Sequence, residues 1–309
     1  MPELPEVETI VRDLRPELTG RTIGHARLSH DDVLRGVTKR KLIAALAGAR
    51  IVDVTRRAKH AVIELESVAR PVRPALRSPR LPRPLRPLRP LRPLRLPRLP
   101  LPAPLRLVVQ PGMTGSLLIH NQSSPVDRYA VLRAPLDDGR ELVYRDVRRL
   151  GTILLLDAAG WSRYDAALGP EPLDPTLTPR RFHAILQSSR QAIKKVLMDQ
   201  RRVVGVGNIY ANEALFAAGI DPSKPAERLT THDARRLFLH VKRILRAAIA
   251  SQGTTFRDYR TGTGERGNFQ LELFVYGREG ERCRVCGTRL AHTHDIDARV
   301  TVFCHKCQR

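Results

Sequence analysis

Val203-Val204-Gly205-Val206-Gly207-Asn208, residues 203–208, interrupts a helical region and determines how the second half of the chain folds. Upstream, apolar residues recur at helical spacing from Thr178-Pro179, a favourable N-cap and N1 pair, to about Asp199. Downstream, a second helix is expected over 209–218, where Gly219 ends it. Two glycines just before a helix let backbone N–H groups approach an anion. We therefore predict a pair of helices whose connecting turn binds a phosphate.

The four cysteines of the chain all lie in its last 27 residues, as two Cys-x2-Cys pairs separated by 17 residues. Four thiolates at this spacing are typical of a tetrahedral zinc site. Because four protein ligands leave no open position on the metal, we expect one structural Zn²⁺ per chain, and no organic cofactor. A redox dithiol is the alternative, which the presence of two pairs disfavours. The predicted ligands are Cys283, Cys286, Cys304 and Cys307.

The first half of the chain has the pattern of a β-sandwich. A helix over 6–18 comes first, and many short β-type runs with turn signals follow it. Asp138-Gly139 marks a tight turn between two of these runs. Residues 168–173 resemble an interdomain linker, and a longer helix is predicted over 231–251. The predicted strands are 51–54, 61–65, 105–109, 116–120, 129–133, 141–145 and 152–156.

Residues 70–106 interrupt the β region with a low-complexity segment. They contain eleven Arg, twelve Pro and no Asp, Glu or Lys. Eight arginines from Arg77 to Arg98 stand three residues apart, so a polyproline II helix would place them along one edge. This composition cannot form a core. We favour a tolerated expansion of a hairpin loop over the alternative, an auxiliary phosphate-binding arm.

Charge and hydropathy restrict the function. The formal net charge is +23, and +12 remains without residues 70–106, so the chain is expected to bind a polyanion, most of all nucleic acid. The sequence has no run of 18 apolar residues and no basic-then-apolar start. We therefore expect neither a membrane span nor a secretory signal. A length of 309 residues with 42% hydrophobic content is enough for about two domains.

The chain begins Met1-Pro2-Glu3-Leu4-Pro5-Glu6. A small second residue permits removal of the initiator methionine, which would leave Pro2 as a terminal secondary amine. Once deprotonated, such an amine attacks an electrophilic carbon and forms an iminium (Schiff-base) intermediate. Glu3 beside it can transfer protons. The alternative is that the two prolines only stiffen the entry to the first helix.

Together these motifs resemble the Fpg/Nei family of DNA glycosylases over nearly the full length of the chain, apart from 70–106. Leu4 favours the Fpg branch, because the Nei branch usually has glycine at that position. The matching segments are Met1 to Glu6, Arg57-Ala58-Lys59, 112–117, 146–151, 168–173, 203–210 with 217–222, and the two Cys-x2-Cys pairs.

The resemblance implies an α+β multidomain fold. An N-terminal catalytic β-sandwich domain with a flanking helix would span 1–157 and carry the insert 70–106. An interdomain linker would follow at 158–177. A helix-two-turns-helix DNA-binding domain with a lesion-capping loop would span 178–270, and a zinc-finger β-hairpin 271–309.

The resemblance also implies an activity, that of a bifunctional DNA glycosylase/AP lyase in base excision repair. Such an enzyme flips an oxidised purine, 8-oxoguanine or a formamidopyrimidine, out of the stack and cuts its glycosidic bond. Pro2 would attack the sugar C1′, Glu3 would protonate the ring oxygen, and β- and δ-elimination would break the strand. Glu6 matches the family's terminal motif, but a helix-start carboxylate is an equal alternative. The implied enzyme is a monomer on damaged double-stranded DNA, in the bacterial cytoplasm and associated with the nucleoid.

Other residues match positions that contact DNA in the family. Lys59, Asn208 and Arg299 match phosphate-contacting positions, and we group Lys59 and Arg299 with the catalytic set. Lys194 is a weaker candidate for a phosphate contact, because a solvated lysine on a helix fits it equally well.

Three residues match those that fill the hole left by the flipped base: Met113, Arg148 and Leu150. An apolar wedge and an arginine donor suit this gap, because the lost stacking must be offset and the orphan base paired again. Residues 253–267 with Phe269 match the loop that covers the damaged base, and their glycine content suits a mobile lid.

Several residues depart from the family pattern. Gln110, which we count among the DNA-binding residues, stands where histidine is common, and Pro111 stands where leucine is. Val147 replaces a proline, and Leu150 replaces a phenylalanine wedge. Three other functions stay open from the sequence: a Nei-like glycosylase for oxidised pyrimidines, a non-catalytic damaged-DNA-binding relative, and a zinc-ribbon RNA-binding protein.

Overall fold

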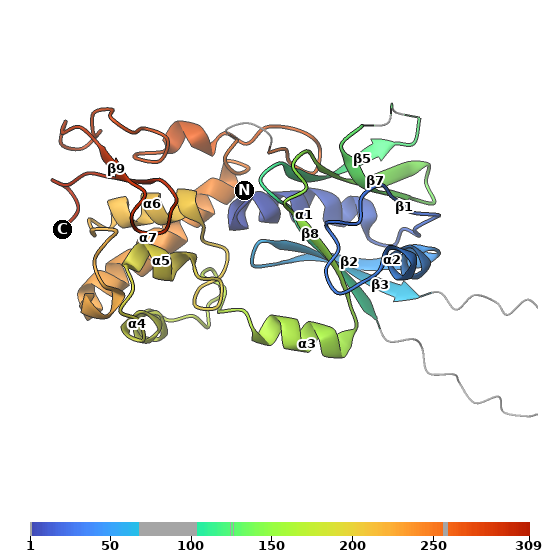
Figure 1. Cartoon of the computed structure of the whole chain (residues 1–309), viewed down its shortest axis with the longest axis horizontal. Helices are drawn as coiled ribbons and strands as arrows, with labels where there is room; N and C mark the ends of the chain where they lie inside the picture. The colour runs from blue at the N-terminus through green and yellow to red at the C-terminus, as the bar shows by residue number, and fades with distance from the viewer. Residues whose placement is uncertain (1, 68–103, 124, 126, 256–258) are drawn as a thin grey trace, which may run out of the picture.

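The computed structural model of the chain describes residues 2–67, 104–123, 125, 127–255 and 259–309. Met1, whose removal is expected, and nearly all of the predicted insert 70–106 lie outside the described residues. The described chain forms a β-rich first lobe and a helical second lobe, with the C-terminal segment packed on the second lobe (Figure 1).

The first lobe is the predicted β-sandwich. It has two four-stranded antiparallel sheets, ordered β1-β6-β7-β5 and β2-β3-β4-β8. Buried apolar side chains from both sheets form one core. The predicted turn at Asp138-Gly139 joins β6 to β7, and Gly139 has the positive φ of 83° that such a turn requires. The strands are β1 (Arg27–Leu28), β2 (Ala49–Arg57), β3 (His60–Ser67), β4 (Leu105–Gln110), β5 (Gly115–Asn121), β6 (Ala130–Pro135), β7 (Arg140–Asp146) and β8 (Thr152–Leu156).

Two short helices of the first lobe were not predicted. Helix α2 (Lys39–Leu46) begins after an N-cap, the side chain of Thr38, and buries only two leucines. Helix α3 (Ala158–Ala166) begins after Asp157, whose carboxylate accepts from the Gly160 N–H at 2.7 Å. It buries no residue, so it lacks the apolar face by which a helix is found in a sequence. Helix α3 occupies the first half of the expected linker 158–177.

The second lobe is built around a separate apolar core. The turn at 203–208 lies between its helices as predicted. However, the single helix expected from 178 to about 199 is two helices with a break. The helix breaks where its backbone carbonyls bond to a distant segment. The Ala226 N–H donates to the Gln191 carbonyl, and the Glu227 N–H donates to the Ser189 carbonyl. The helices are α4 (Pro179–Gln187), α5 (Ile193–Met198), α6 (Asn208–Ala217), η1 (Ala226–Arg228), α7 (Thr231–Ala250) and η2 (Phe269–Glu272). None of the helices in the described chain is long and apolar enough to cross a membrane.

The C-terminal segment contains the predicted β-hairpin, formed by β9 (Ala291–Thr293) and β10 (Thr301–Phe303). A small third core with the cysteines lies beneath it. The hairpin is attached to α6, because the Val302 N–H donates to Asn212 Oδ1 at 2.8 Å.

Helix α1 (Leu4–Leu18) joins the two lobes, and it begins two residues earlier than predicted. Glu3 is its N-cap, and a reciprocal capping box links Glu3 and Glu6. Leu4 packs in the core of the second lobe, whereas Val7 packs in the core of the first. One helical turn therefore crosses from one core to the other.

The insert leaves the sandwich from one end of β3. Leu65 pairs with Leu105 across β3 and β4, so the chain departs from and returns to neighbouring positions. The turn that carries Lys59 lies at the opposite end of β3, eight residues away. At ~3.3 Å per residue this separation is about 26 Å, so the attachment point is remote from Lys59.

Candidate active site

The carboxylate of Glu3 lies on the first turn of α6. Glu3 Oε2 accepts from the Gly207 N–H at 2.6 Å, and Oε1 accepts from the Ile209 N–H at 2.9 Å. The orphan N–H groups and the dipole of a helix N-terminus stabilise an anion in this place. The sequence predicts a DNA phosphate on these amides, but the structure places the Glu3 carboxylate there. Pro2, the candidate nucleophile, is buried beside this carboxylate.

Lys59 approaches the same point from the first lobe. It is only 4% exposed, and its ammonium lies 2.6 Å from where a Cβ on Gly207 would stand. Glu3 Oε1 lies 2.5 Å from that same point. Burial lowers the pKa of Lys59, and the nearby positive charge of Arg299 adds to this effect, whereas Glu3 opposes it. Only glycine at position 207 leaves room for both charged groups.

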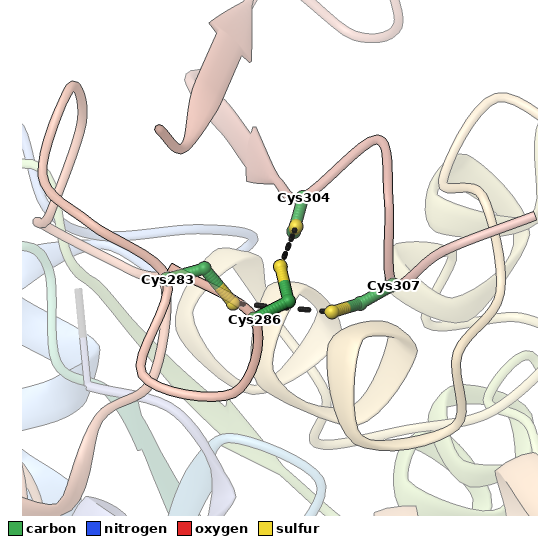
Figure 2. A group of neighbouring side chains, drawn as sticks. All are labelled: Cys283, Cys286, Cys304 and Cys307. Carbon is green, nitrogen blue, oxygen red and sulfur yellow. Dashed lines mark hydrogen bonds between the residues drawn. The ribbon is translucent and has the colours of Figure 1, made fainter. Parts of the chain in front are cut away.

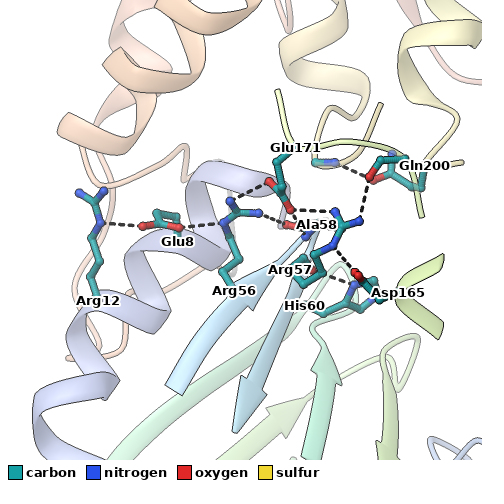
Figure 3. Close-up of polar contacts among 11 residues, drawn as sticks. Glu8, Arg12, Arg56, Arg57, Ala58, His60, Asp165, Glu171 and Gln200 are labelled. Atoms are coloured by element: carbon teal, nitrogen blue, oxygen red, sulfur yellow. Dashed lines mark hydrogen bonds and ion pairs between the residues drawn. The ribbon is translucent and has the colours of Figure 1, made fainter. Parts of the chain in front are cut away.

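A network of ion pairs fixes the turn that carries Lys59 (Figure 3). Ala58 takes a left-handed φ of 54°, and its N–H donates to Glu171 Oε1 at 2.7 Å. Arg57 donates to the same oxygen at 3.1 Å and to Asp165 at 2.5 Å. Arg56 lies 2.8 Å from the second oxygen of Glu171. The segment between the lobes therefore holds the turn in place.

Glu6 joins three segments beneath Glu3. Its carboxylate accepts from the Glu3 N–H at 2.8 Å, the Tyr210 hydroxyl at 2.5 Å and the Thr254 N–H at 2.8 Å. Burial raises the pKa of Glu6, and the negative charge of Glu3 raises it further. Of the two roles open from the sequence, these contacts support the helix-start carboxylate. Glu6 also anchors the start of the predicted lid.

The predicted lid is only partly within the described chain, because residues 256–258 lie outside it. Phe269, expected to help cover the damaged base, is instead 5% exposed in the core of the second lobe. Its ring centroid lies 5.9 Å from that of Tyr210. Phe269 therefore supports the loop from below, because its apolar ring is used in packing.

Of the predicted phosphate contacts, the structure brings Asn208 and Arg299 close to the Glu3–Lys59 pair. Arg299 is exposed near the tip of the hairpin and is close enough to affect Lys59 electrostatically. One N–H of the Asn208 side-chain amide donates to the Val300 carbonyl at 3.0 Å. This contact places Asn208 against the backbone that carries Arg299.

Lys194 differs from the expectation of a phosphate contact. Its side chain is completely buried, and its ammonium donates to Thr301 Oγ1 at 2.8 Å, the Val300 carbonyl at 3.2 Å and Asp297 Oδ1 at 3.3 Å. A buried ammonium requires such partners. Lys194 thus ties the hairpin to the second lobe and presents no surface to a ligand.

The three predicted hole-filling residues lie on two adjacent loops of the first lobe. Met113 is 42% exposed and Leu150 is 55% exposed, although both are large and apolar, and Arg148 is exposed beside them. Gln110 is half-buried at the base of these loops, where its side-chain oxygen lies 3.5 Å from the Thr152 hydroxyl. Gln110 therefore lies at the end of β4, paired with Thr152 of β8.

The four cysteines form a compact group, and Figure 2 shows their side chains directed toward one another. All four sulfur atoms lie within 4.8 Å of one another. The Cys286–Cys304 and Cys283–Cys307 sulfur pairs are 3.4 and 3.9 Å apart. A tetrahedral site with metal–sulfur bonds of about 2.3 Å needs sulfur separations of about 3.8 Å. The group therefore fits one tetrahedral metal ion.

Comparison with known proteins agrees with this geometry. Residues 1–153 match the formamidopyrimidine-DNA glycosylase N-terminal domain, and residues 168–260 match the formamidopyrimidine-DNA glycosylase H2TH domain. The chain is 38% identical to the formamidopyrimidine-DNA glycosylase of Stutzerimonas stutzeri, with all of both chains covered. The chain belongs to the formamidopyrimidine-DNA glycosylase family. The relative from Xanthomonas campestris is 39% identical, again over the full length of both proteins.

Solved structures of this family share the fold. The chain superimposes on Lactococcus lactis Fpg (MutM) in complex with DNA containing N7-benzyl-Fapy-dG, with a TM-score of 0.82, 27% identity and full coverage of both chains. Thermus thermophilus MutM (Fpg) gives a TM-score of 0.78 and 32% identity, with 99% of this chain and 98% of that one covered. Another Lactococcus lactis Fpg structure contains DNA with an abasic site.

Sequence reasoning missed the residues that hold the functional groups in place. Glu171 and Thr254 are examples: both lie in segments that match the family, but their partners are 113 and 248 positions away in the chain, so these contacts could not be read from the segments. Asp146 lies inside a motif that the family resemblance identified, but its buried contacts could not be read from that motif. Glycines that recur around it, Gly112 and Gly151, were the available signal of close backbone approach.

Proposed function

We propose that this member of the formamidopyrimidine-DNA glycosylase family is a bifunctional DNA glycosylase/AP lyase that excises oxidised purines in base excision repair. The observation that carries the proposal is the position of Glu3. Its carboxylate is held by two amides of α6, follows the buried Pro2 and lies close to Lys59. The closeness of a potential nucleophile, a carboxylate that can transfer protons and a cation supports this proposal.

The chemistry follows from these groups once Met1 is removed. The nitrogen of Pro2 attacks C1′ of the damaged nucleotide, and the glycosidic bond breaks with its electron pair leaving on the base. The Glu3 carboxylate accepts the proton that the Pro2 nitrogen loses and delivers it to the sugar ring oxygen, so the ring opens as the iminium forms. Loss of the 3′ and then the 5′ phosphate by β- and δ-elimination cuts the strand, and water then releases Pro2 from the remaining sugar fragment.

Lys59, Asn208 and Arg299 would hold the DNA phosphates around the damaged nucleotide. Their grouping near Glu3 supports this role, because phosphate contacts fix the register of a protein on DNA. Met113, Arg148 and Leu150 would enter the gap left by the flipped base, and their exposure supports this. Gln110 remains a proposed DNA-binding residue, and Lys194 would act on DNA only through the hairpin.

The metal site would hold one structural Zn²⁺ through Cys283, Cys286, Cys304 and Cys307. Four thiolates favour zinc over harder cations and leave it no catalytic position. The domain boundaries 1–157, 158–177, 178–270 and 271–309 remain our division of the chain, with α3 inside the linker. We propose a monomer that acts on damaged duplex DNA in the bacterial cytoplasm, associated with the nucleoid.

Borohydride trapping tests this function. We expect a covalent protein–DNA adduct with a duplex that carries one 8-oxoguanine opposite cytosine. Glu3→Gln and a form with a retained N-terminal extension before Pro2 should give none. No adduct from correctly processed protein would refute the enzymatic proposal. Trapping on a thymine-glycol duplex but not on 8-oxoguanine would instead indicate the Nei-like specificity.

A further inference from the structure

The loops that carry Met113, Arg148 and Leu150 meet at one buried side chain, that of Asp146. It ends β7 and pairs with Gly115, the first residue of β5. Asp146 is 1% exposed, although the three residues around it are exposed. Among the described residues it has no ion-pair partner within 4 Å. Neutral donors therefore satisfy its buried carboxylate, which is costly unless each oxygen is hydrogen-bonded.

Each oxygen of this carboxylate holds a different loop. Oδ1 accepts from the Thr114 hydroxyl at 2.6 Å. Oδ2 accepts from the Gly151 N–H at 2.9 Å and from the Tyr144 hydroxyl at 3.0 Å. Thr114 Oγ1 in turn accepts from the Arg148 N–H at 2.9 Å. The chain of hydrogen bonds thus runs from Thr114, the residue after Met113, to Arg148 and to Gly151, the residue after Leu150.

Glycines allow the two loops to approach this closely. A Cβ on Gly112 would lie 2.5 Å from the Gly151 nitrogen and 2.8 Å from Asp146 Oδ2. A Cβ on Gly151 would overlap the Tyr144 hydroxyl. These distances are shorter than the contacts that Cβ atoms make in proteins, so neither glycine could carry a side chain without moving its neighbours. The backbones of the two loops therefore pack directly against each other around the carboxylate.

We propose that Asp146 is a positioning residue that holds Met113, Arg148 and Leu150 as one rigid wedge for insertion into the DNA stack. The proposal rests on the proposed function, because it assigns these residues the filling of the gap. A wedge built from two separate loops can enter a base-sized gap only if the loops do not move relative to each other. The carboxylate provides this link without itself reaching the DNA.

The test compares three reactions of Asp146→Asn and Thr114→Val with those of the wild-type enzyme. The first is single-turnover excision of 8-oxoguanine from a duplex, and the second is the fluorescence rise of 2-aminopurine placed beside the lesion, which reports unstacking. The third is borohydride trapping on a single-stranded abasic oligonucleotide, which needs Pro2 and Glu3 but has no gap to fill. Thr114→Ser, which keeps the hydroxyl, is the matched rescue variant.

We expect excision and the fluorescence rise to fall about tenfold or more in both variants, because each loses at least one buried hydrogen bond. Trapping on the single strand should stay near the wild-type level, and Thr114→Ser should recover excision. Equal loss in all three reactions, or unchanged excision, would overturn the positioning role. Failure of the wild-type enzyme to trap abasic DNA would refute the proposed function instead. If Asp146→Asn does not fold, Thr114→Val decides alone.

Discussion

Glu3 Oε2 lies 2.6 Å from the backbone nitrogen of Gly207, so a carboxylate from the start of the chain caps a helix of the other lobe. The two residues are 204 positions apart. The catalytic carboxylate of the proposed reaction is therefore oriented by the backbone of the second lobe. Correct docking of the lobes is then a condition for catalysis.

Gly207→Ala tests this orientation. The added Cβ would lie 2.5 Å from Glu3 Oε1 and 2.6 Å from Lys59 Nζ, so both charged groups must move. We expect the single-turnover rate on an 8-oxoguanine duplex to fall about a hundredfold, since displacements of about 1 Å can cost this much. Gly24→Ala is the control, because its Cβ would be 3.5 Å from the nearest atom. Equal rates for the two variants would contradict the prediction.

Lys59→Met should stabilise the protein while abolishing excision. The pKa of Lys59 is lowered in the folded state, mainly by burial, so folding is penalised wherever the lysine is charged in both states. The penalty amounts to ~1.4 kcal/mol per pKa unit of lowering. It disappears as the pH rises from the lowered pKa to the ordinary value of 10.5.

Urea unfolding at a series of pH values measures this effect. The free energy of unfolding of Lys59→Met should exceed that of the wild-type protein at pH 7, and the difference should shrink toward pH 10.5. Lys195→Met, at an exposed lysine, is the control and should show no such trend. A difference that grows with pH would show that the charged form of Lys59 is favoured by folding.

Lys194→Met distinguishes a tether from a phosphate contact. It leaves Asp297 without its ammonium partner, and breaking a buried pair typically costs ~3–5 kcal/mol. The slope of log affinity against log salt should stay unchanged, because no phosphate contact is lost. Arg299→Ala should reduce that slope by about 0.9 without a comparable loss of stability. A reduced slope for Lys194→Met would instead support the phosphate contact that the sequence predicts for Lys194.

Removal of the metal should release the hairpin and leave the sandwich folded. The core beneath the hairpin contains only six buried residues, four of them apolar and two cysteines, so it is too small to persist alone. We expect chelation to remove one equivalent of zinc and to weaken duplex binding, because Asn208 and Arg299 lose their shared support. The single tryptophan, Trp161, lies on α3 and should keep its fluorescence. Recovery of binding on adding zinc is the control.

Deletion of residues 68–103 should leave excision unchanged. Leu65 and Leu105 are neighbours across two paired strands, so a short turn can replace the segment. Its point of attachment is at the end of β3 away from Lys59. Equal single-turnover rates and equal salt slopes for the two proteins would support a tolerated expansion. A smaller slope in the deletion variant would show that its arginines contact phosphates.

The elements that the sequence predicted are those whose signal is local. Alternating apolar residues located the strands of the sandwich, and cysteine spacing located the metal group. The break between α4 and α5 could not be predicted, because Gln191 bonds to a segment 35 residues away. For the same reason the sequence predicts a phosphate on the amides of α6, although the Glu3 carboxylate occupies them. Burial of Lys194 likewise depends on the hairpin folding over it.

Because Leu4 belongs to one core and Val7 to the other, a rotation between the lobes would have to be absorbed within one turn of α1. In any rigid rotation, displacement grows with distance from the axis. Opening of the molecule to admit a duplex would therefore move the tips of the lobes far and the start of α1 little. The Glu3 carboxylate, which is bonded to α6, would then move with the second lobe and keep its orientation on that lobe.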